Sequence, residues 1–282
     1  MATDLKLAAT LFVFFAMIAA VFAVAVSPFI SHAPAAEDIR AIASAPPQPK
    51  LRALGAADFL VSYPQDAPPD IRPMAVLGFG IVNETHKYAQ AYIGNKLSCG
   101  NCHFRGGMMD GGRNGGVSLV GVASRYPALD KKTGSVIDLA ERVNQCFRQE
   151  LAGKGLPAGS REQVAVITYL HWIGRGIPVY AEMNWLRPGT LPVSRAPDVA
   201  AGEQVFRTIC STCHGPGGQG SLIAPPVWGA GSFTAAAAMN QVSNLAPFVY
   251  YNMPRGNPSL TPSQALDAAG FVSTRPRPAG TS

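Results

Sequence analysis

Apolar residues form one long run near the start of the chain and shorter amphipathic segments after it. From Leu7 to Val26 the only polar residue is Thr10, and as a helix this run spans about 30 Å, the thickness of one bilayer core. A cleaved signal peptide usually has a shorter apolar stretch and a more basic start, although residues 33–35 (Ala-Pro-Ala) form a candidate cleavage site. We therefore expect residues 1–30 to be a retained membrane anchor, with a cleaved signal peptide as the alternative.

The composition then shifts to alanine and proline. Residues 31–75 include two Pro-Pro pairs, and such a stretch is typical of an extended, semi-rigid spacer. Short helices are predicted to interrupt it at 38–43 and 56–61. We expect this segment to separate the anchor from the first folded domain.

Two later segments, residues 76–185 and 196–282, repeat one order of elements. Each has a helix, a Cys-x-x-Cys-His motif, a long loop and a final helix. The helices are predicted at 83–93, around Cys146, from Ser160 to Gly174, at 199–209 and after Thr261. Both final helices begin with a capping signal, a hydroxyl residue followed three positions later by Gln163 or Gln264. The pattern therefore predicts two domains of similar build.

The two Cys-x-x-Cys-His motifs indicate covalent haem attachment. Their thiols form thioethers with the porphyrin, and the adjacent histidine binds the iron. A zinc site would need four ligands in one shell, and a thioredoxin-like pair would not carry histidine directly after its second cysteine in two places. The haem-binding residues are Cys99, Cys102 and His103 in the first motif and Cys210, Cys213 and His214 in the second. We expect an all-α protein of two tandem cytochrome c-type domains, each with one covalent haem c, behind the N-terminal membrane segment.

Cys146 is left without a partner in the chain, because the other four cysteines belong to the motifs. It can be a small buried hydrophobe, or the second axial ligand of the first haem, opposite His103. Leu139, Val143 and Cys146 follow helical spacing, and Arg142 one turn earlier favours a thiolate. The spacing leaves both interpretations open, with Met183 as the rival ligand.

The distal ligand of the second haem is predicted to be Met253. It follows His214 at the distance usual for such domains and lies in an Asn-Met-Pro loop before the last helix. Met239 is the alternative ligand. His86 and His171 are expected to be ordinary helix residues.

Charge excludes one class of function and suggests another. The chain carries 23 basic and 17 acidic residues, a formal net charge of +6, with no basic run interleaved with aromatics, so nucleic-acid binding is not expected. Residues 99–154 are biased toward the basic side. The basic residues there are Arg105, Arg113, Arg125, Lys131, Lys132, Arg142, Arg148 and Lys154. This bias suits a dianionic ligand, although a solvated basic face explains most of these positions.

Several short motifs together resemble the dihaem thiosulfate dehydrogenases, over about residues 76 to 279. They are the stretches 97–103, 125–127, 142–147, 155–157, 225–229, 252–254 and 275–278. The resemblance implies that Cys146 is the distal ligand of a catalytic haem at which thiosulfate is oxidised to tetrathionate. Arg142 and Lys132 are the expected pocket residues, and the second haem, held by His214 and Met253, would receive the electrons.

The resemblance also implies partners and a location. An external electron-acceptor cytochrome or a terminal oxidase would take the electrons. The chain would face the periplasm from the inner membrane, because haem of this type is attached outside the cytoplasm.

The sequence departs from this family near the expected pocket. Glu150 stands where a small hydroxyl residue is usual, Ala152 replaces an asparagine, and Lys132 stands where an arginine is expected. A carboxylate near a bound dianion is unfavourable, and lysine lacks the bidentate grip of arginine. Lys154, four residues after Glu150, could offset its charge. Two hypotheses therefore remain: a thiosulfate dehydrogenase or a relative acting on a similar sulfur anion, and a membrane-anchored electron carrier without substrate chemistry.

Overall fold

The computed structural model describes residues 61–108 and 117–280, so the predicted membrane anchor lies outside the described residues. Within those ranges no helix is long and apolar enough to cross a bilayer. The described chain is mostly helical, with one two-stranded antiparallel hairpin. Its strands are β1 (Ala128–Leu129) and β2 (Val136–Ile137), with Ala128 opposite Ile137.

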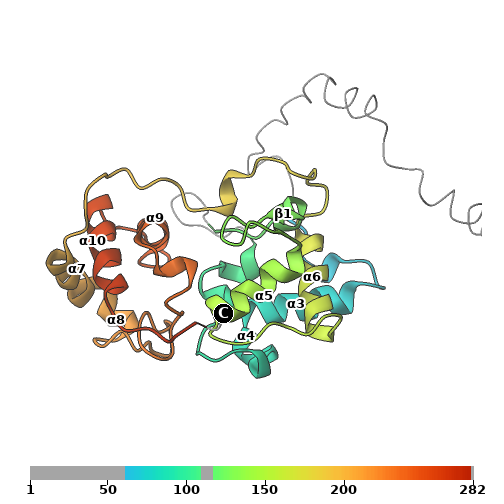
Figure 1. Cartoon of the computed structure of the whole chain (residues 1–282), viewed down its shortest axis with the longest axis horizontal. Coiled ribbons are helices and arrows are strands. Elements are labelled where there is room, and N and C mark those ends of the chain that lie inside the picture. The colour runs from blue at the N-terminus through green and yellow to red at the C-terminus, as the bar shows by residue number, and fades with distance from the viewer. Residues whose placement is uncertain (1–60, 109–116, 281–282) are drawn as a thin grey trace, which may run out of the picture. The chain divides into compact units, whose positions relative to one another are not determined.

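The helices fall into two groups (Figure 1). The first group is α3 (Arg72–Asn83), α4 (Thr85–Tyr88), α5 (Leu139–Gln149) and α6 (Arg161–Ile173). The second is α7 (Val199–Val205), the π-helical turn η8 (Phe206–Cys210), α8 (Ser211–His214), α9 (Val242–Asn252) and α10 (Pro262–Ser273). The 3-10 turns are η2 (Pro64–Asp66), η3 (Gln90–Tyr92), η4 (Cys99–Asn101), η5 (Phe104–Gly107), η6 (Val122–Arg125), η7 (Asn184–Leu186) and η9 (Ala238–Asn240).

Each group has a close crossing of its first and last helix. In the first, α3 crosses α6 where a side chain at Gly78 would overlap the carbonyl of Ala165. In the second, α7 crosses α10 where a side chain at Gly202 would overlap the carbonyl of Asp267. Only glycine allows the two backbones to approach so closely. The two helix groups, which correspond to the two predicted repeats, therefore share the same kind of close helix crossing.

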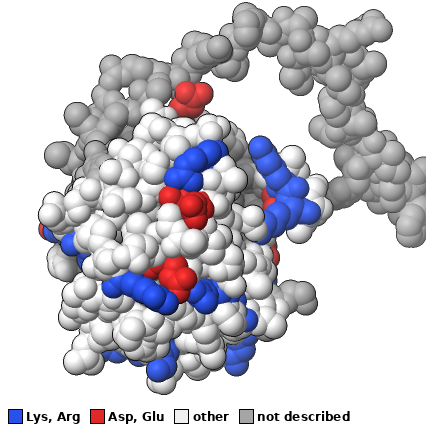
Figure 2. Space-filling view, turned by 90° about the vertical axis from the view of Figure 1, so that its left-hand side faces the viewer, with Lys and Arg blue, Asp and Glu red and all other residues white. Residues whose placement is uncertain are grey.

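The second group packs around three aromatic rings. The Phe206 and Trp228 rings have centroids 4.6 Å apart, and Phe271 lies within 5.8 Å of both. Arg275 stacks over Phe271 at 3.9 Å. The surface on the side where α7, α8 and α10 lie is mostly white, with separate groups of basic and acidic side chains spread over it (Figure 2).

The predicted spacer at 31–75 is wrong for its described end. Pro64, Ala67 and Ala75 are buried in the first core, and α3 already begins at Arg72. Proline is tolerated in the first turn of a helix, where its missing N–H has no partner to lose. The helix predicted at 83–93 is instead divided into α4 and η3.

The end of the chain corrects a second prediction. Helix α9 was not expected, and it contains Pro247, which removes one helical hydrogen bond. Asn252 is therefore helical, and the loop begins only at Met253. The caps are confirmed: the Ser160 side chain accepts the Gln163 N–H, and Thr261 and Gln264 form a complete capping box.

The Arg195–Asp267 ion pair generates a stability prediction. Both Asp267 oxygens accept from Arg195 at 2.7 Å, and one also accepts the Asp198 N–H. Since the Asp267 side chain is only 8% exposed and Arg195 38%, solvent screening reduces but does not remove the cost of breaking the pair. Asp267→Asn should lower the free energy of unfolding at pH 7 by about 2 kcal/mol.

This loss should depend on pH. The hydrogen bonds from Arg195 hold the pKa of Asp267 below its usual value, so its contribution is present above the unfolded pKa of about 3.9 and is lost as the pH falls through the folded pKa. Denaturant unfolding followed by circular dichroism should show the gap closing below about pH 4. Glu203→Gln, which breaks an exposed pair with Arg207, is the control and should cost less than about 1 kcal/mol. A gap that persists in acid would contradict this account.

Candidate functional site

The first Cys-x-x-Cys-His motif lies on a tight turn that fixes its histidine. The Ser98 N–H donates to the Asn101 side chain at 2.7 Å, which closes the turn η4 around Cys99. The Nδ1 of His103 lies 2.8 Å from the carbonyl of Val117. This carbonyl can only accept, so Nδ1 carries the proton and Nε2 keeps its lone pair for iron. Burial lowers the pKa of His103, which favours the neutral imidazole that a ligand requires.

The second motif repeats this arrangement on a helix. The turn η8 runs directly into α8, and the Nδ1 of His214 lies 2.8 Å from the carbonyl of Pro225. Burial again lowers the pKa of the histidine. Both motifs therefore present a neutral, oriented imidazole beside two thiols, which is the donor set of a covalently bound haem.

The thiols of the first motif are held in the protonated form. Burial raises the pKa of Cys99 to about 11 and that of Cys102 to about 12. The negative charges of Cys146 and Glu150 also contribute to both shifts. Cys146 therefore lies within electrostatic reach of the thiols that would attach the first haem.

Helix α5 places Arg142, Cys146 and Glu150 one turn apart. Burial raises the pKa of the Cys146 thiol, and Arg142 opposes this shift. In return, Cys146 is the largest cause of the raised pKa of Arg142. Met183, the rival ligand, is buried in the first core and packs against Gly121. Arg142 and Cys146 therefore lie within electrostatic reach of each other.

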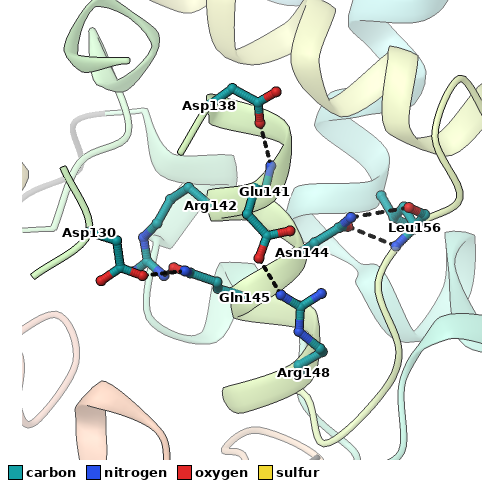
Figure 3. A network of polar contacts seen from close by, with 8 residues as sticks. All are labelled: Asp130, Asp138, Glu141, Arg142, Asn144, Gln145, Arg148 and Leu156. Carbon is teal, nitrogen blue, oxygen red and sulfur yellow. Dashed lines mark hydrogen bonds and ion pairs between the residues drawn. The ribbon is translucent and has the colours of Figure 1, made fainter. Parts of the chain in front are cut away.

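A polar network holds Arg142 on the side of α5 (Figure 3). Its Nη1 donates to Gln145 at 3.4 Å, and Gln145 donates to Asp130 at 2.7 Å. Tyr126 adds a side-chain hydrogen bond with Arg142. The Asp138 side chain caps the helix by accepting the Glu141 N–H. The guanidinium is therefore oriented from a fixed helix without a direct carboxylate partner among these bonds.

The other basic residues divide into two kinds. Burial raises the pKa of Glu150, and Arg142 and Lys132 both oppose this shift, so the two predicted pocket residues act on the same carboxyl. Arg148 pairs instead with Glu141, and Lys154 lies over the Tyr92 ring at 5.7 Å rather than beside Glu150. The expectation that Lys154 offsets the charge of Glu150 is therefore wrong, and Arg142 and Lys132 offset it instead. Arg113 lies outside the described residues.

Sequence reasoning missed a set of hydrogen bonds between the end of α5 and the second domain, here called the interdomain clasp. Its members are Asn95, Gln149, Glu150, Ser232, Thr234 and Ala238. Asn95 donates to the carbonyls of Glu150 and Ser232 at 2.8 and 2.9 Å. The Thr234 hydroxyl donates to the Gln149 carbonyl at 2.7 Å, and the Glu150 Oε1 accepts the Ala238 N–H at 2.8 Å. Backbone carbonyls have no sequence signature, so only the polar side chains could have hinted at it.

The two haem-binding regions meet through aromatic contacts. Phe104 follows His103 directly, and its ring centroid lies 6.0 Å from that of Phe248 on α9. Arg255, two residues after Met253, stacks over the same Phe104 ring at 4.5 Å. The segment that carries the predicted distal methionine of the second domain therefore packs beside the iron-binding histidine of the first.

The two candidate methionines differ in their setting. Met253 is the first extended residue after α9, and its N–H donates to the Val249 carbonyl. Met239 lies in η9, next to the clasp residue Ala238, and packs against the cores of both domains. Of the remaining histidines, His86 bonds Ser98 through Nδ1 at 2.8 Å and His171 is exposed on α6.

Two family models and several thiosulfate dehydrogenases are similar to this chain. Residues 85–179 match the family described as SoxA/TsdA, cytochrome c domain, and residues 197–272 match the cytochrome c oxidase, cbb3-type, subunit III family. A thiosulfate dehydrogenase of Thiomonas intermedia is 36% identical over 83% of this chain and 76% of its own length. One of Allochromatium vinosum is 34% identical over 72% of this chain and 78% of its own length.

A solved structure agrees in fold. The thiosulfate dehydrogenase TsdBA of Marichromatium purpuratum superimposes with a TM-score of 0.71 at 26% identity. The match covers 78% of this chain and half of the solved chain. With two complete attachment motifs, two cytochrome c domains and these relatives, the protein carries two covalently bound haem c groups. The chain belongs to the thiosulfate dehydrogenase family of dihaem c-type cytochromes.

Proposed function

We propose that this chain oxidises thiosulfate to tetrathionate at the first haem and passes the electrons through the second haem to an external cytochrome. The observation that carries the proposal is that Arg142 and Cys146 lie one turn apart on α5, close enough for each to shift the pKa of the other. A sulfur nucleophile beside an oriented guanidinium suits a sulfur dianion. The relatives named thiosulfate dehydrogenase support the choice of substrate.

The proposal extends to the iron ligands. We assign His103 and Cys146 to the first haem and His214 and Met253 to the second. Bound haem supplies one-electron redox chemistry, and a thiolate ligand lowers its potential whereas a methionine raises it. This difference favours electron movement from the first site to the second. The Phe104 contacts with Phe248 and Arg255 support a short path between them.

Side chains of this protein carry out the sulfur–sulfur bond formation in this proposal. In its thiolate form, Cys146 Sγ forms an S–S bond with the sulfane sulfur of one thiosulfate, and the two electrons released would be accepted by the two bound haems, one each. The sulfane sulfur of a second thiosulfate then displaces the Cys146 thiolate and leaves as tetrathionate. No proton is gained or lost. Arg142 and Lys132 hold the sulfonate groups and offset the repulsion between the two dianions.

The alternative function, an electron carrier without substrate chemistry, is favoured by one residue. Glu150 places a carboxylate one turn from Cys146, where it would repel a dianion. Burial raises the pKa of this carboxyl, which weakens the objection, and its Oε1 is directed to the Ala238 N–H. The enzyme is therefore the better supported function. We further propose that residues 7–26 tether it to the periplasmic side of the inner membrane.

Met253→Ala tests the second ligand set. Thioether ligation gives ferric haem a weak near-infrared charge-transfer band, so this band should disappear in the variant because the sulfur is gone. The matched control is Met239→Ala, which should keep it. If the band survives in Met253→Ala and disappears in Met239→Ala, the assignment passes to Met239.

Glu150→Gln tests the carboxylate near the pocket. The amide oxygen can still accept the Ala238 N–H, so the clasp is kept while the charge is removed. The KM for thiosulfate should fall about threefold, and most at low ionic strength, where screening is weakest. Glu150→Ser should lower the KM as well but also weaken the clasp, which a drop in Tm would reveal. An unchanged KM at every salt concentration would show that the carboxylate does not act on the substrate.

Cys146→Ala decides between enzyme and carrier. Because the thiolate is both ligand and nucleophile in this proposal, the variant should lose the thiolate-type low-spin electron paramagnetic resonance signal. It should also lose tetrathionate formation, at least about a hundredfold. A pyridine haemochrome assay that still finds two haems per chain is the control for assembly.

Two outcomes would favour the carrier. One is a wild-type protein inactive with thiosulfate and tetrathionate that still exchanges electrons rapidly with a cytochrome. The other is a Glu150→Ser variant that gains an activity the wild type lacks, since the carboxylate would then be blocking the pocket.

A further inference from the structure

The loop after the second haem motif carries the most exposed apolar side chains among the described residues. Leu222 has a relative exposure of 106% and Ile223 of 79%. The loop is ordered by its own backbone: the Ser221 N–H donates to the Ala224 carbonyl, and the Ile223 N–H donates to the Ser221 hydroxyl. Two adjacent branched side chains held in water on a fixed turn are unfavourable for an isolated protein and mark an interaction site.

This loop is anchored to the iron-binding histidine at both ends. The Gly220 N–H donates to the backbone carbonyl of His214 at 2.8 Å, and the Pro225 carbonyl holds the His214 imidazole. Leu222 and Ile223 lie between these two anchors. A partner that covers them is thereby brought beside the second haem-binding site.

The chain on either side of the loop is uncharged. From Thr208 to Pro254 the chain contains no Lys, Arg, Asp or Glu. The view onto the side of α7, α8 and α10 is correspondingly white over most of its area (Figure 2). The basic residues predicted to bind substrate all belong to the first domain, and the charged residues of the second domain lie outside the segment 208–254.

We propose that Leu222 and Ile223 form the docking tip for the electron acceptor, a small soluble c-type cytochrome with an uncharged apolar rim around its own haem edge. The inference rests on the proposed function for the direction of electron flow. One electron passes from the second haem to the ferric partner in each encounter. Charge complementarity argues for this occupant, because a partner with a strongly charged patch finds no counter-charge in the segment 208–254 that carries the tip. A membrane surface is disfavoured, since this segment holds no basic residue to attract anionic lipids.

The test measures electron transfer without requiring thiosulfate. The intact dihaem protein is reduced with dithionite, desalted, and mixed in a stopped-flow instrument with a ferric mono-haem bacterial cytochrome c of near-neutral charge. Leu222→Ser/Ile223→Ser should slow the second-order reoxidation about tenfold, because two apolar contacts are lost. Reoxidation by ferricyanide should be unchanged. The matched control is Val136→Ser/Val179→Ser, which removes two exposed side chains of the first domain, 70% and 61% exposed, and should leave both rates unchanged.

Ionic strength provides a second readout. The wild-type rate with the neutral cytochrome should change less than about twofold between low and high salt, since the segment that carries the tip is uncharged. An unchanged cytochrome rate in the Leu222/Ile223 variant would overturn the proposal. So would an equal loss in the control variant, or binding of the tip to phosphatidylcholine–phosphatidylglycerol vesicles without any effect on reoxidation. Because the electrons come from dithionite, a failure of thiosulfate oxidation would not affect this result.

Discussion

The attachment of helix α5 at its C-terminal end is the constraint on which the functional arrangement depends. This one helix carries Arg142 and Cys146 on the side of the first haem-binding motif, and its last carbonyls are bound by Asn95 and Thr234. The clasp therefore fixes the position of Cys146 relative to the second domain as well as to the first. A shift of α5 would alter the ligand, the anion pocket and the contact between the two haem-binding regions together.

The protonation of the pocket groups Cys146 and Glu150 is governed mainly by desolvation rather than by direct ion pairs. Cys146 is a partly buried thiol: desolvation raises its pKa, and Arg142 opposes that shift. Glu150 is a partly buried carboxyl whose pKa is likewise raised by desolvation, against the opposing effect of the Ala238 N–H and Arg142. A partly buried cation that stabilises a thiolate and is not fully neutralised remains available for an incoming anion. Arg142 is such a cation, because its hydrogen-bond partners Gln145 and Tyr126 are uncharged side chains that orient the guanidinium without cancelling its charge.

The features predictable from sequence are those encoded within a few neighbouring residues. The haem motifs, the caps at Ser160 and Thr261, and the helix around Cys146 all have local signals, and the family comparisons confirm the haems. Helix α9 was missed because Pro247 interrupts its pattern. The clasp was missed because it joins side chains to backbone carbonyls over eighty residues away, for which no residue type is diagnostic. From spacing alone Glu150 is a charge in the pocket, and only the structure shows its second role as an acceptor for Ala238.

The two domains divide the electrostatic demands of the reaction between them. Capturing two dianions requires cationic side chains, and those that act on Cys146 and Glu150, Arg142 and Lys132, lie in the first domain. The same charges around the electron exit would attract substrate and product to a surface where they are not needed and would hold an anionic partner too long for repeated turnover. An apolar tip within an uncharged segment avoids both effects, since apolar contacts are short-ranged and are released as a unit. The absence of charge between Thr208 and Pro254 is thus the counterpart of the basic pocket.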